Sequence, residues 1–221
     1  MLKRSLVLAG ILIIASATAG FAQGKVEATI FGGWTFADGV SGQALVVPSG
    51  TFDRLDPKDG GLFGLGLGVL FSDNAEGGFQ WTHVSSKLVA GGVLGTPDMN
   101  IADMALDNYH GYLGYNFMAP DAKFRPFLYG GLGATHFGSV DGPRTGAKYG
   151  GNTQFSTTWG AGVKYNVSPR IGVRFTTSWT PVYIKSDASG YWCDPYWGCY
   201  LVGDPQYSNQ ISLTGGLSFR F

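Results

Sequence analysis

The fold of this chain is decided by the stretch that reads Gln210-Ile211-Ser212-Leu213-Thr214-Gly215-Gly216-Leu217-Ser218-Phe219-Arg220-Phe221. Successive side chains of a β-strand point to opposite faces of the sheet, so residues two apart share a face. The odd-numbered positions of this stretch are apolar or glycine, and the even-numbered positions are polar or glycine. The alternation predicts a strand with one face toward lipid and the other toward a wet interior.

The first 22 residues have the features of a secretory signal peptide, namely a basic start, an apolar run over residues 6–15 and small residues near the expected cleavage site. The apolar run is too short to span a bilayer as a helix. We therefore expect residues 1–22 to be removed by cleavage between Ala22 and Gln23. The remaining residues, 23–221, have the length of a single domain.

Charged residues are scarce in the chain. They make up 14% of it, against about a quarter of an average soluble domain. Lys+Arg and Asp+Glu are balanced at 15 each, so no net field would attract nucleic acid, and we expect no nucleic-acid partner. Because no apolar run of about 18 residues follows the signal, a membrane-spanning form of this chain must be a closed β-barrel.

Eight segments alternate over lengths that suit transmembrane strands, which need about nine to eleven residues. The expected strands span residues 25–36, 60–71, 77–87, 105–117, 125–137, 154–167, 171–184 and 210–221. Together they predict an all-β fold, an eight-stranded antiparallel transmembrane up-and-down β-barrel. Phe31 is an exception, since it lies on the polar face of the first strand. The fifth strand is apolar on both faces, which a bulge at Gly130-Gly131 would explain, and its outward face stays open.

The connections between the expected strands alternate between long and short. The long ones lie at about 37–59, 88–104, 138–153 and 185–206, and the short ones lie around 72–76, 118–123 and 168–170. Membrane-spanning β-barrels combine short periplasmic turns with long external loops. The short connections are therefore expected to face the periplasm.

Aromatic side chains on the apolar faces are expected to form two bands, one at each membrane interface. The band at the short-turn end comprises Phe71, Phe79, Trp81, Tyr115, Phe117, Tyr165 and Phe219. The band at the opposite end comprises Trp34, Phe36, Phe63, Phe155, Trp179 and Tyr183.

The polar faces of the strands carry Glu27, Lys164, Arg174 and Arg220, and Glu76 lies near one mouth of the expected barrel. An eight-stranded barrel leaves an interior barely wide enough for side chains. Removing one partner of a buried ion pair costs about 3–5 kcal/mol, so these charges are expected to pair in a network that blocks a continuous water path. The alternative is an ion-selective constriction.

Few residues suggest enzymatic chemistry. The glycines of Gly64-Leu65-Gly66-Leu67-Gly68 alternate with apolar residues in a strand, whereas a phosphate-binding loop needs a following helix. His83, His110 and His136 lie singly on three expected strands, without the paired spacing of a metal site. We expect no catalytic residue, no metal and no cofactor.

The tripeptide His83-Val84-Ser85 leaves an enzymatic alternative open. Its His and Ser share a face of the strand, and the pair resembles the His-Ser pair of the outer-membrane lipid A deacylases. The sequence identifies no carboxylate on an adjoining strand that would orient the histidine as the third member of a triad. The other interpretation is a polar pair at the wet upper end of a strand.

The two cysteines, Cys193 and Cys199, lie within the last expected long loop. In an exported chain they predict a disulfide, with two free thiols as the alternative. Five aromatic residues lie close to the cysteines in the sequence, from Tyr191 to Tyr200. This tip is expected either to present a surface to an unknown ligand or to pack over the barrel mouth.

Three stretches resemble the outer membrane protein β-barrel domain, the family of small eight-stranded barrels of the outer membrane protein A and X type. They are residues 125–134 (RPFLYGGLGA), 159–166 (WGAGVKYN) and 214–221 (TGGLSFRF). The resemblance implies export through the periplasm and insertion into a bacterial outer membrane by the barrel-assembly machinery, with Phe219 and Phe221 matching the assembly signal. It also implies contact with outer-membrane lipids and lipopolysaccharide, and we expect a monomer.

These observations favour a non-enzymatic protein with a structural or surface-interaction role that acts through long external loops. A narrow porin-like channel is the first alternative, and a lipid-modifying enzyme such as a lipid A deacylase is the second. A soluble ligand-binding barrel is the third, but its aromatic side chains would point inward, opposite to the polarity expected here.

Overall fold

The computed structural model describes residues 26–47, 50–93, 95, 97–141, 148–149, 151–184, 192–194, 198–200 and 206–221. The expected signal peptide and its cleavage site at Ala22 and Gln23 lie outside these residues, so both stay predictions. Within the described residues, no helix has the length and apolar character needed to cross a membrane.

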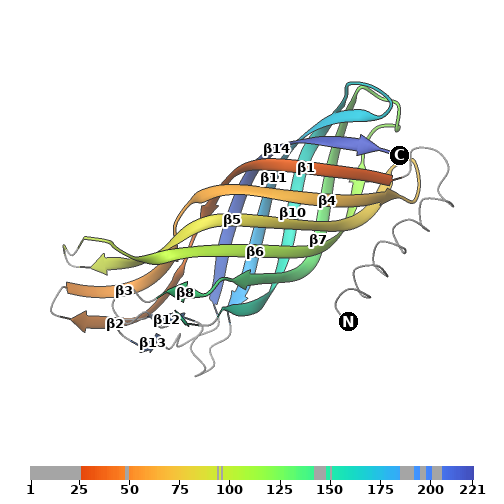
Figure 1. Cartoon of the computed structure of the whole chain (residues 1–221). Helices are drawn as coiled ribbons and strands as arrows, with labels where there is room; N and C mark the ends of the chain where they lie inside the picture. The colour runs from red at the N-terminus through yellow and green to blue at the C-terminus, as the bar shows by residue number, and fades with distance from the viewer. Residues whose placement is uncertain are drawn as a thin grey trace, which may run out of the picture.

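Eight antiparallel strands close into a barrel, as the sequence predicts (Figure 1). In chain order they are β1 (Val26–Ala37), β4 (Gly60–Leu70), β5 (Ala75–Val93), β6 (Met99–Asn116), β7 (Phe124–Phe137), β10 (Asn152–Asn166), β11 (Ile171–Ile184) and β14 (Gln206–Arg220). Each strand pairs with the next one in this list. The ring closes where β14 pairs with β1, from Glu27 opposite Arg220 to Ala37 opposite Gln210.

The outer surface of the barrel is apolar, and its interior is largely polar. On β14, Leu213 is 49% exposed, whereas its neighbour Ser212 is buried. The same inversion of the pattern of a soluble protein recurs around the ring, where large side chains such as Leu113, Phe155 and Phe175 are more than half exposed. Lipid is the solvent that suits such a surface, so the alternation of the sequence predicted the outward faces correctly.

The fifth expected strand, β7, has a defined outward face and no bulge at its two glycines. Its pairing with β10 runs without a register shift across Gly130 and Gly131, so the predicted bulge is wrong. Leu128 and Leu132 face outward, whereas Phe127 and Tyr129 are buried in the interior. The strand is apolar on both faces because the interior at this level holds aromatic rings.

Glycines on neighbouring strands make room for these inward rings. A Cβ atom at Gly160 of β10 would lie 2.3 Å from the Tyr129 ring, and one at Gly162 would lie 2.8 Å from the Phe127 ring. Phe31, the exception on β1, is accommodated in the same way beside Gly64, where a Cβ would lie 2.5 Å from its ring. Because these rings lie so close to the backbone of the neighbouring strand, glycine is required at these positions.

The aromatic bands differ from the expectation at one residue. Trp81 was expected at the short-turn end, but its ring packs edge-on against Phe63, with centroids 5.4 Å apart. Phe63 belongs to the opposite band, so Trp81 belongs there too. At the short-turn end, Tyr115 packs on Phe117 and Phe124 packs on Tyr165, with centroids 5.5 Å and 4.9 Å apart.

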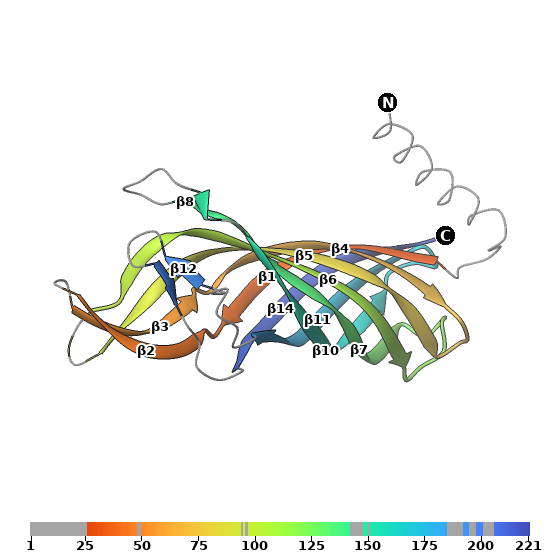
Figure 2. The same cartoon turned by 90° about the horizontal axis from the view of Figure 1, so that it is seen from below.

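Two of the expected long loops are largely β-structure. The connection at 37–59 contains β2 (Val40–Val47) and β3 (Gly50–Pro57), which pair with each other. β3 then pairs with the upper part of β5, from Thr51 opposite Val93 to Pro57 opposite Leu88. We call β2, β3 and the paired upper parts of β5 and β6 the flap. Figures 1 and 2 show it projecting beyond the ends of β11 and β14, on the side away from the C-terminus.

The sequence concealed the flap because β5 does not alternate there. Leu88, Val89 and Ala90 are consecutive and all buried, so both faces of the strand are covered at this level. The expected connection at 88–104 therefore shrinks to the residues between Val93 and Met99. Two further hairpins lie in the remaining long connections, β8 (Val140–Asp141) with β9 (Lys148–Tyr149), and β12 (Trp192–Asp194) with β13 (Gly198–Tyr200).

Candidate functional site

The interior of the barrel at its short-turn end contains an ion-pair cluster. Lys164 of β10 lies between two carboxylates, with its Nζ 3.0 Å from Glu27 Oε1 and 2.6 Å from Glu76 Oε2. Arg220 of β14 donates from Nε to the second oxygen of Glu27 at 3.0 Å. All four side chains are buried. We call these four residues the ionic layer, which joins four different strands across the interior.

Two asparagines extend the ionic layer, and the sequence analysis did not single them out. Asn116 donates from Nδ2 to Glu76 Oε2 at 3.0 Å, and Asn166 Oδ1 accepts from Arg220 Nη2 at 2.6 Å. Asn166 also donates to the carbonyl oxygens of Pro120 and Ala122. The ionic layer is thereby tied to the turn that follows β6, at the mouth of the barrel. Positions like these two can be found in a sequence as polar residues on the inward face of a strand, just before a short turn.

Arg125 is fully buried, and it too was absent from the predicted network. Its Nη2 donates to the carbonyl oxygen of Asp73 at 3.0 Å, and its Nε donates to that of Met118 at 3.3 Å. Both acceptors belong to short turns. Arg125 therefore joins two turns across the mouth.

Arg174, which the sequence placed in the charge network, makes a different set of contacts. Its guanidinium carbon lies 4.3 Å from the centroid of the Phe127 ring and 5.8 Å from that of Tyr129. Its Nε donates to Thr176 Oγ1 at 3.3 Å. No ion pair joins it to a carboxylate in the part of the chain that the structure describes. The predicted pairing of Arg174 with a carboxylate is wrong, because aromatic rings of β7 occupy one face of its guanidinium group.

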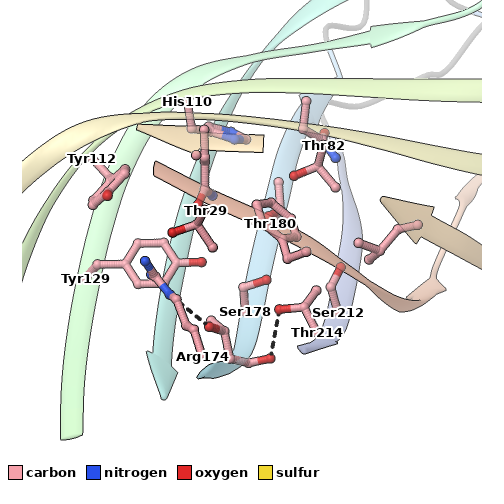
Figure 3. A pocket seen from close by; sticks show the side chains of 16 residues that line it. Thr29, Thr82, His110, Tyr112, Tyr129, Arg174, Ser178, Thr180, Ser212 and Thr214 are labelled. Carbon is pink, nitrogen blue, oxygen red and sulfur yellow. Dashed lines mark hydrogen bonds between the residues drawn. The ribbon is translucent and has the colours of Figure 1, made fainter. Parts of the chain in front are cut away.

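A small polar cavity lies beside Arg174 (Figure 3). Its volume is about 40 Å³. That space suits roughly three water molecules. Many of its lining residues carry hydroxyl groups, among them Thr29, Tyr112, Thr176, Ser178 and Thr214. The cavity is therefore a wet pocket with one strong cation.

A hydrogen-bonded layer lies farther from the short turns. His110 Nε2 is 2.9 Å from Ser156 Oγ, and Thr135 Oγ1 is 3.0 Å from the same hydroxyl. Thr135 donates to Asn108 Oδ1 at 2.6 Å, and Asn108 donates from Nδ2 to Gln210 Oε1 at 3.1 Å. All five side chains are buried. His110 is thus part of a structural network of neutral groups rather than an isolated histidine.

Beyond this network, the interior near the long connections is mainly apolar, although Thr35 and Ser208 are also buried there. Six inward side chains there are buried, namely Leu62, Val84, Leu106, Phe137, Val182 and Ile184. They come from five of the eight barrel strands. Side chains therefore pack across the barrel at three levels, which are ionic, hydrogen-bonded and apolar in turn.

The outer wall carries a polar cluster around His83, a residue that one interpretation of the sequence placed at a wet strand end. His83 faces outward beside Trp81 and Phe63 rather than into the wet interior. Its Nδ1 lies 2.9 Å from Asp107 Oδ1, which also accepts from Trp81 Nε1 at 3.1 Å. Asp107 is the carboxylate that the sequence did not identify, and it lies directly opposite His83 in the register of β5 and β6. Only the strand register could have revealed it.

His83, Asp107 and His136 occupy adjacent register positions on three strands, but they do not assemble a metal site. Nδ1 of His136 instead lies 2.9 Å from Thr153 Oγ1. Among the residues that the structure describes, no group of three or more His, Cys, Asp or Glu side chains is placed to hold a metal ion.

The cysteine pair is described by its backbone alone. Cys193 lies opposite Cys199 in the hairpin of β12 and β13, and the side chains fall outside the described part of the structure, so the disulfide stays a prediction. At the end of β14, Phe221 is 67% exposed, and its backbone nitrogen donates to Val26 O at 3.0 Å. The assembly role of Phe219 and Phe221 also stays a prediction.

The ionic layer leads to a prediction about Lys164. Replacing it with methionine keeps the length of the side chain but leaves Glu27 with one cation and Glu76 with none of its ion pairs. We expect Lys164→Met to lower the free energy of unfolding by about 3–5 kcal/mol, because a buried charge is left uncompensated. Urea titration of the barrel refolded in detergent measures this change.

The exposed Lys123 in a short turn provides the matched control, and Lys123→Met is expected to change stability by less than about 0.5 kcal/mol. In a Glu76→Gln background the cost of Lys164→Met should fall, because one of the two carboxylates is already neutral. Equal, small effects of the two lysine variants would contradict a stabilising role for the ionic layer.

Comparison with known proteins agrees with this geometry. The family model of the outer membrane protein beta-barrel domain matches residues 5–221. Neisserial surface protein A has a TM-score of 0.56 at 15% identity, with 89% of this chain and 97% of that chain covered. The outer membrane protein AlkL has a TM-score of 0.51 at 14% identity, with 91% and 92% covered.

The N-terminal β-barrel domain of Pseudomonas aeruginosa OprF gives a TM-score of 0.45 at 14% identity, over 89% of this chain and 98% of that chain. No curated protein sequence matches the chain. The family resemblance noted in the sequence is confirmed, and so are the eight-stranded barrel and its location. The chain belongs to the outer membrane protein β-barrel domain family and is a protein of the bacterial outer membrane.

Proposed function

We propose that this protein is a non-enzymatic, plugged outer-membrane scaffold that acts at the cell surface through its flap. The flap is the observation that carries the proposal. β5 has 19 residues and β6 has 18, whereas a tilted transmembrane strand needs about nine to eleven. At about 3.4 Å per residue, the surplus corresponds to roughly 25 Å of strand beyond the membrane-spanning part.

The flap lies at the long-connection end, which in this class of barrel faces outward from the cell. Its two outer strands, β2 and β3, add to the sheet without taking part in barrel closure. Their formation orders backbone at a cost of about 1–2 kcal/mol per residue. An ordered sheet at the cell surface suits contact with a partner better than a flexible loop does, because less entropy is lost on binding.

The layered interior supports the view that the barrel is plugged. Lys164 and Arg220 tie the carboxylates of Glu27 and Glu76 into the ionic layer across the short-turn mouth. A narrow pore would need water to pass this layer and the apolar layer of Leu62, Leu106 and Ile184 at the other end. Both would have to open together.

The surroundings of the scaffold follow from its surface. The exposed apolar wall is suited to outer-membrane lipids and lipopolysaccharide. The outward rings near the end of β14 are suited to recognition by the barrel-assembly machinery, with Phe219 and Phe221 as its signal. The continuous ring of strands needs no second copy, so we propose a monomer.

Single-channel conductance tests whether the barrel interior blocks the passage of ions. We expect the refolded protein to give no discrete single-channel steps in a planar bilayer, while the same sample shows the heat-dependent gel shift of a folded barrel. The Lys164→Met and Lys123→Met variants serve as a pair, and neither should give steps, because the apolar layer of Leu62, Leu106 and Ile184 stays closed when the ionic layer is disturbed. Reproducible steps from the wild-type protein would contradict the plugged scaffold and favour a narrow porin-like channel.

Removing β2 and β3, the two outer strands of the flap, tests the surface role. Ala37 N donates to Asp59 Oδ1 at 3.0 Å, so the chain ends that flank β2 and β3 already lie together. Deleting residues 40–57 should therefore join β1 to β4 by a short turn and leave the barrel at its normal level in the outer membrane. We expect adhesion of expressing cells to immobilised matrix proteins and glycans to be lost.

The control for this deletion is the heat-dependent gel shift of the same cells, which reports a folded barrel. Adhesion that is equal in the wild type and in the variant without β2 and β3 would contradict the proposal. A wild type that binds none of these surfaces would contradict it as well.

One observation favours a second candidate function, a lipid hydrolase. Asp107 holds Nδ1 of His83 at 2.9 Å, and Ser85 lies on the same outward face of β5 and is exposed. This order of groups suits a nucleophile, a base and an orienting carboxylate turned toward membrane lipid. Among the described residues, however, no hydrogen bond joins Ser85 Oγ to the His83 ring, which is why this candidate ranks second.

The acylation pattern of lipid A in cells tests whether the protein is a lipid hydrolase. If the scaffold proposal holds, Ser85→Ala and Asp107→Asn leave the acylation pattern measured by mass spectrometry unchanged. Ser86→Ala is the matched control, because its hydroxyl faces the other way and donates to Lys58 O. Loss of a deacylated species in the first two variants but not in the control would overturn the non-enzymatic proposal.

A further inference from the structure

The charges inside the barrel do not balance. Of the charged side chains that the described barrel strands turn inward, two are carboxylates, Glu27 and Glu76, and four are cations, Arg125, Lys164, Arg174 and Arg220. These groups lie in a wall that hydrocarbon surrounds, where an uncompensated charge is strongly destabilising. The inward side chains of the strands alone therefore carry an excess of positive charge, which Asp121 of a short turn offsets in part at Arg125.

Arg174 is where the excess is located. Lys164 and Arg220 share the two carboxylates. Arg125 is held by two backbone carbonyl oxygens at the mouth. Arg174 has the Thr176 hydroxyl and two aromatic rings, but no carboxylate within ion-pair distance among the described residues.

The cavity beside Arg174 has the composition of an anion site. No carboxylate lines it, and Arg174 is the one permanent cation that does. The hydroxyl groups of Thr29, Thr176 and Ser178 can each rotate to donate a hydrogen bond inward, whereas that of Thr214 donates to the Thr176 carbonyl oxygen at 3.3 Å. Figure 3 shows the guanidinium group beside the Tyr129 ring at one side of this hollow.

We propose that this cavity binds a small monovalent inorganic anion of the halide class, with Arg174 as its counter-charge. The volume of about 40 Å³ accommodates a chloride-sized ion with one or two waters. It is too small for a nucleotide, a sugar phosphate or a lipid headgroup. The anion would lie against a half-buried cation that forms no ion pair with the ionic layer. This inference is independent of the surface role and holds whether or not the barrel conducts.

Bromide is the probe, because it resembles chloride in size and scatters X-rays anomalously. The protein is refolded and crystallised in sodium bromide, and we expect an anomalous difference peak in the cavity beside the Arg174 guanidinium. Arg174→Gln, which keeps a hydrogen-bonding side chain without charge, should lose the peak. Arg170→Gln, at an exposed arginine in a short turn, should keep it. Water alone in the wild-type cavity, or an undiminished peak in Arg174→Gln, would overturn the proposal.

A solution measurement covers the case in which Arg174→Gln fails to fold. The thermal unfolding midpoint of the wild type is compared in sodium bromide and in sodium gluconate at equal ionic strength, since gluconate is too large for the cavity. Binding to the folded state alone raises the midpoint, so we expect a saturable increase in bromide. Equal midpoints in the two salts at every concentration would contradict an anion site.

Discussion

The ladder of hydrogen bonds that returns from β14 to β1 is the feature on which the rest of this structure depends. In hydrocarbon there is no water to satisfy an open strand edge, so a sheet that spans the membrane must close on itself. Closure fixes which face of each strand meets lipid, and thereby the two-residue period of the sequence. It also confines every inward side chain to a space that eight strands make narrow. The ionic layer, the packing of the aromatic rings and the inward glycines are all consequences of this narrow interior.

Confinement explains how the interior charges are arranged. Glu27 and Glu76 lie near the start of their strands, and Lys164 and Arg220 lie near the end of theirs. Because neighbouring strands run in opposite directions, these opposite charges come to one level of the barrel. Arg174 lies where two rings of β7 already fill the space, and it uses them as partners. The interior is thus sorted by position along the strands, from ionic to hydrogen-bonded to apolar. This order suits a barrel that resists the passage of ions at one end and of water at the other.

The sequence predicts the parts of this fold in which one face of a strand meets lipid and the other does not. β11 was expected at residues 171–184 and has those bounds. The faces of β7 escaped prediction because the glycines that accommodate Phe127 and Tyr129 lie on another strand. The flap escaped because Leu88 to Ala90 are buried on both faces, which removes the period. The inward charges could be listed from the sequence, but the contacts of Arg174 and the pairing of His83 with Asp107 depend on register, which a single sequence does not give.

One strand, β5, changes its neighbour on one side along its length, and this has a mechanical consequence. It pairs with β4 inside the membrane and with β3 above it, while β6 accompanies it throughout. A pull on the flap along the strand axis is therefore passed straight into the barrel wall. The hydrogen bonds along β5 would share such a load in shear rather than opening one after another. A tether built this way resists tension at the cell surface without a separate stalk or hinge.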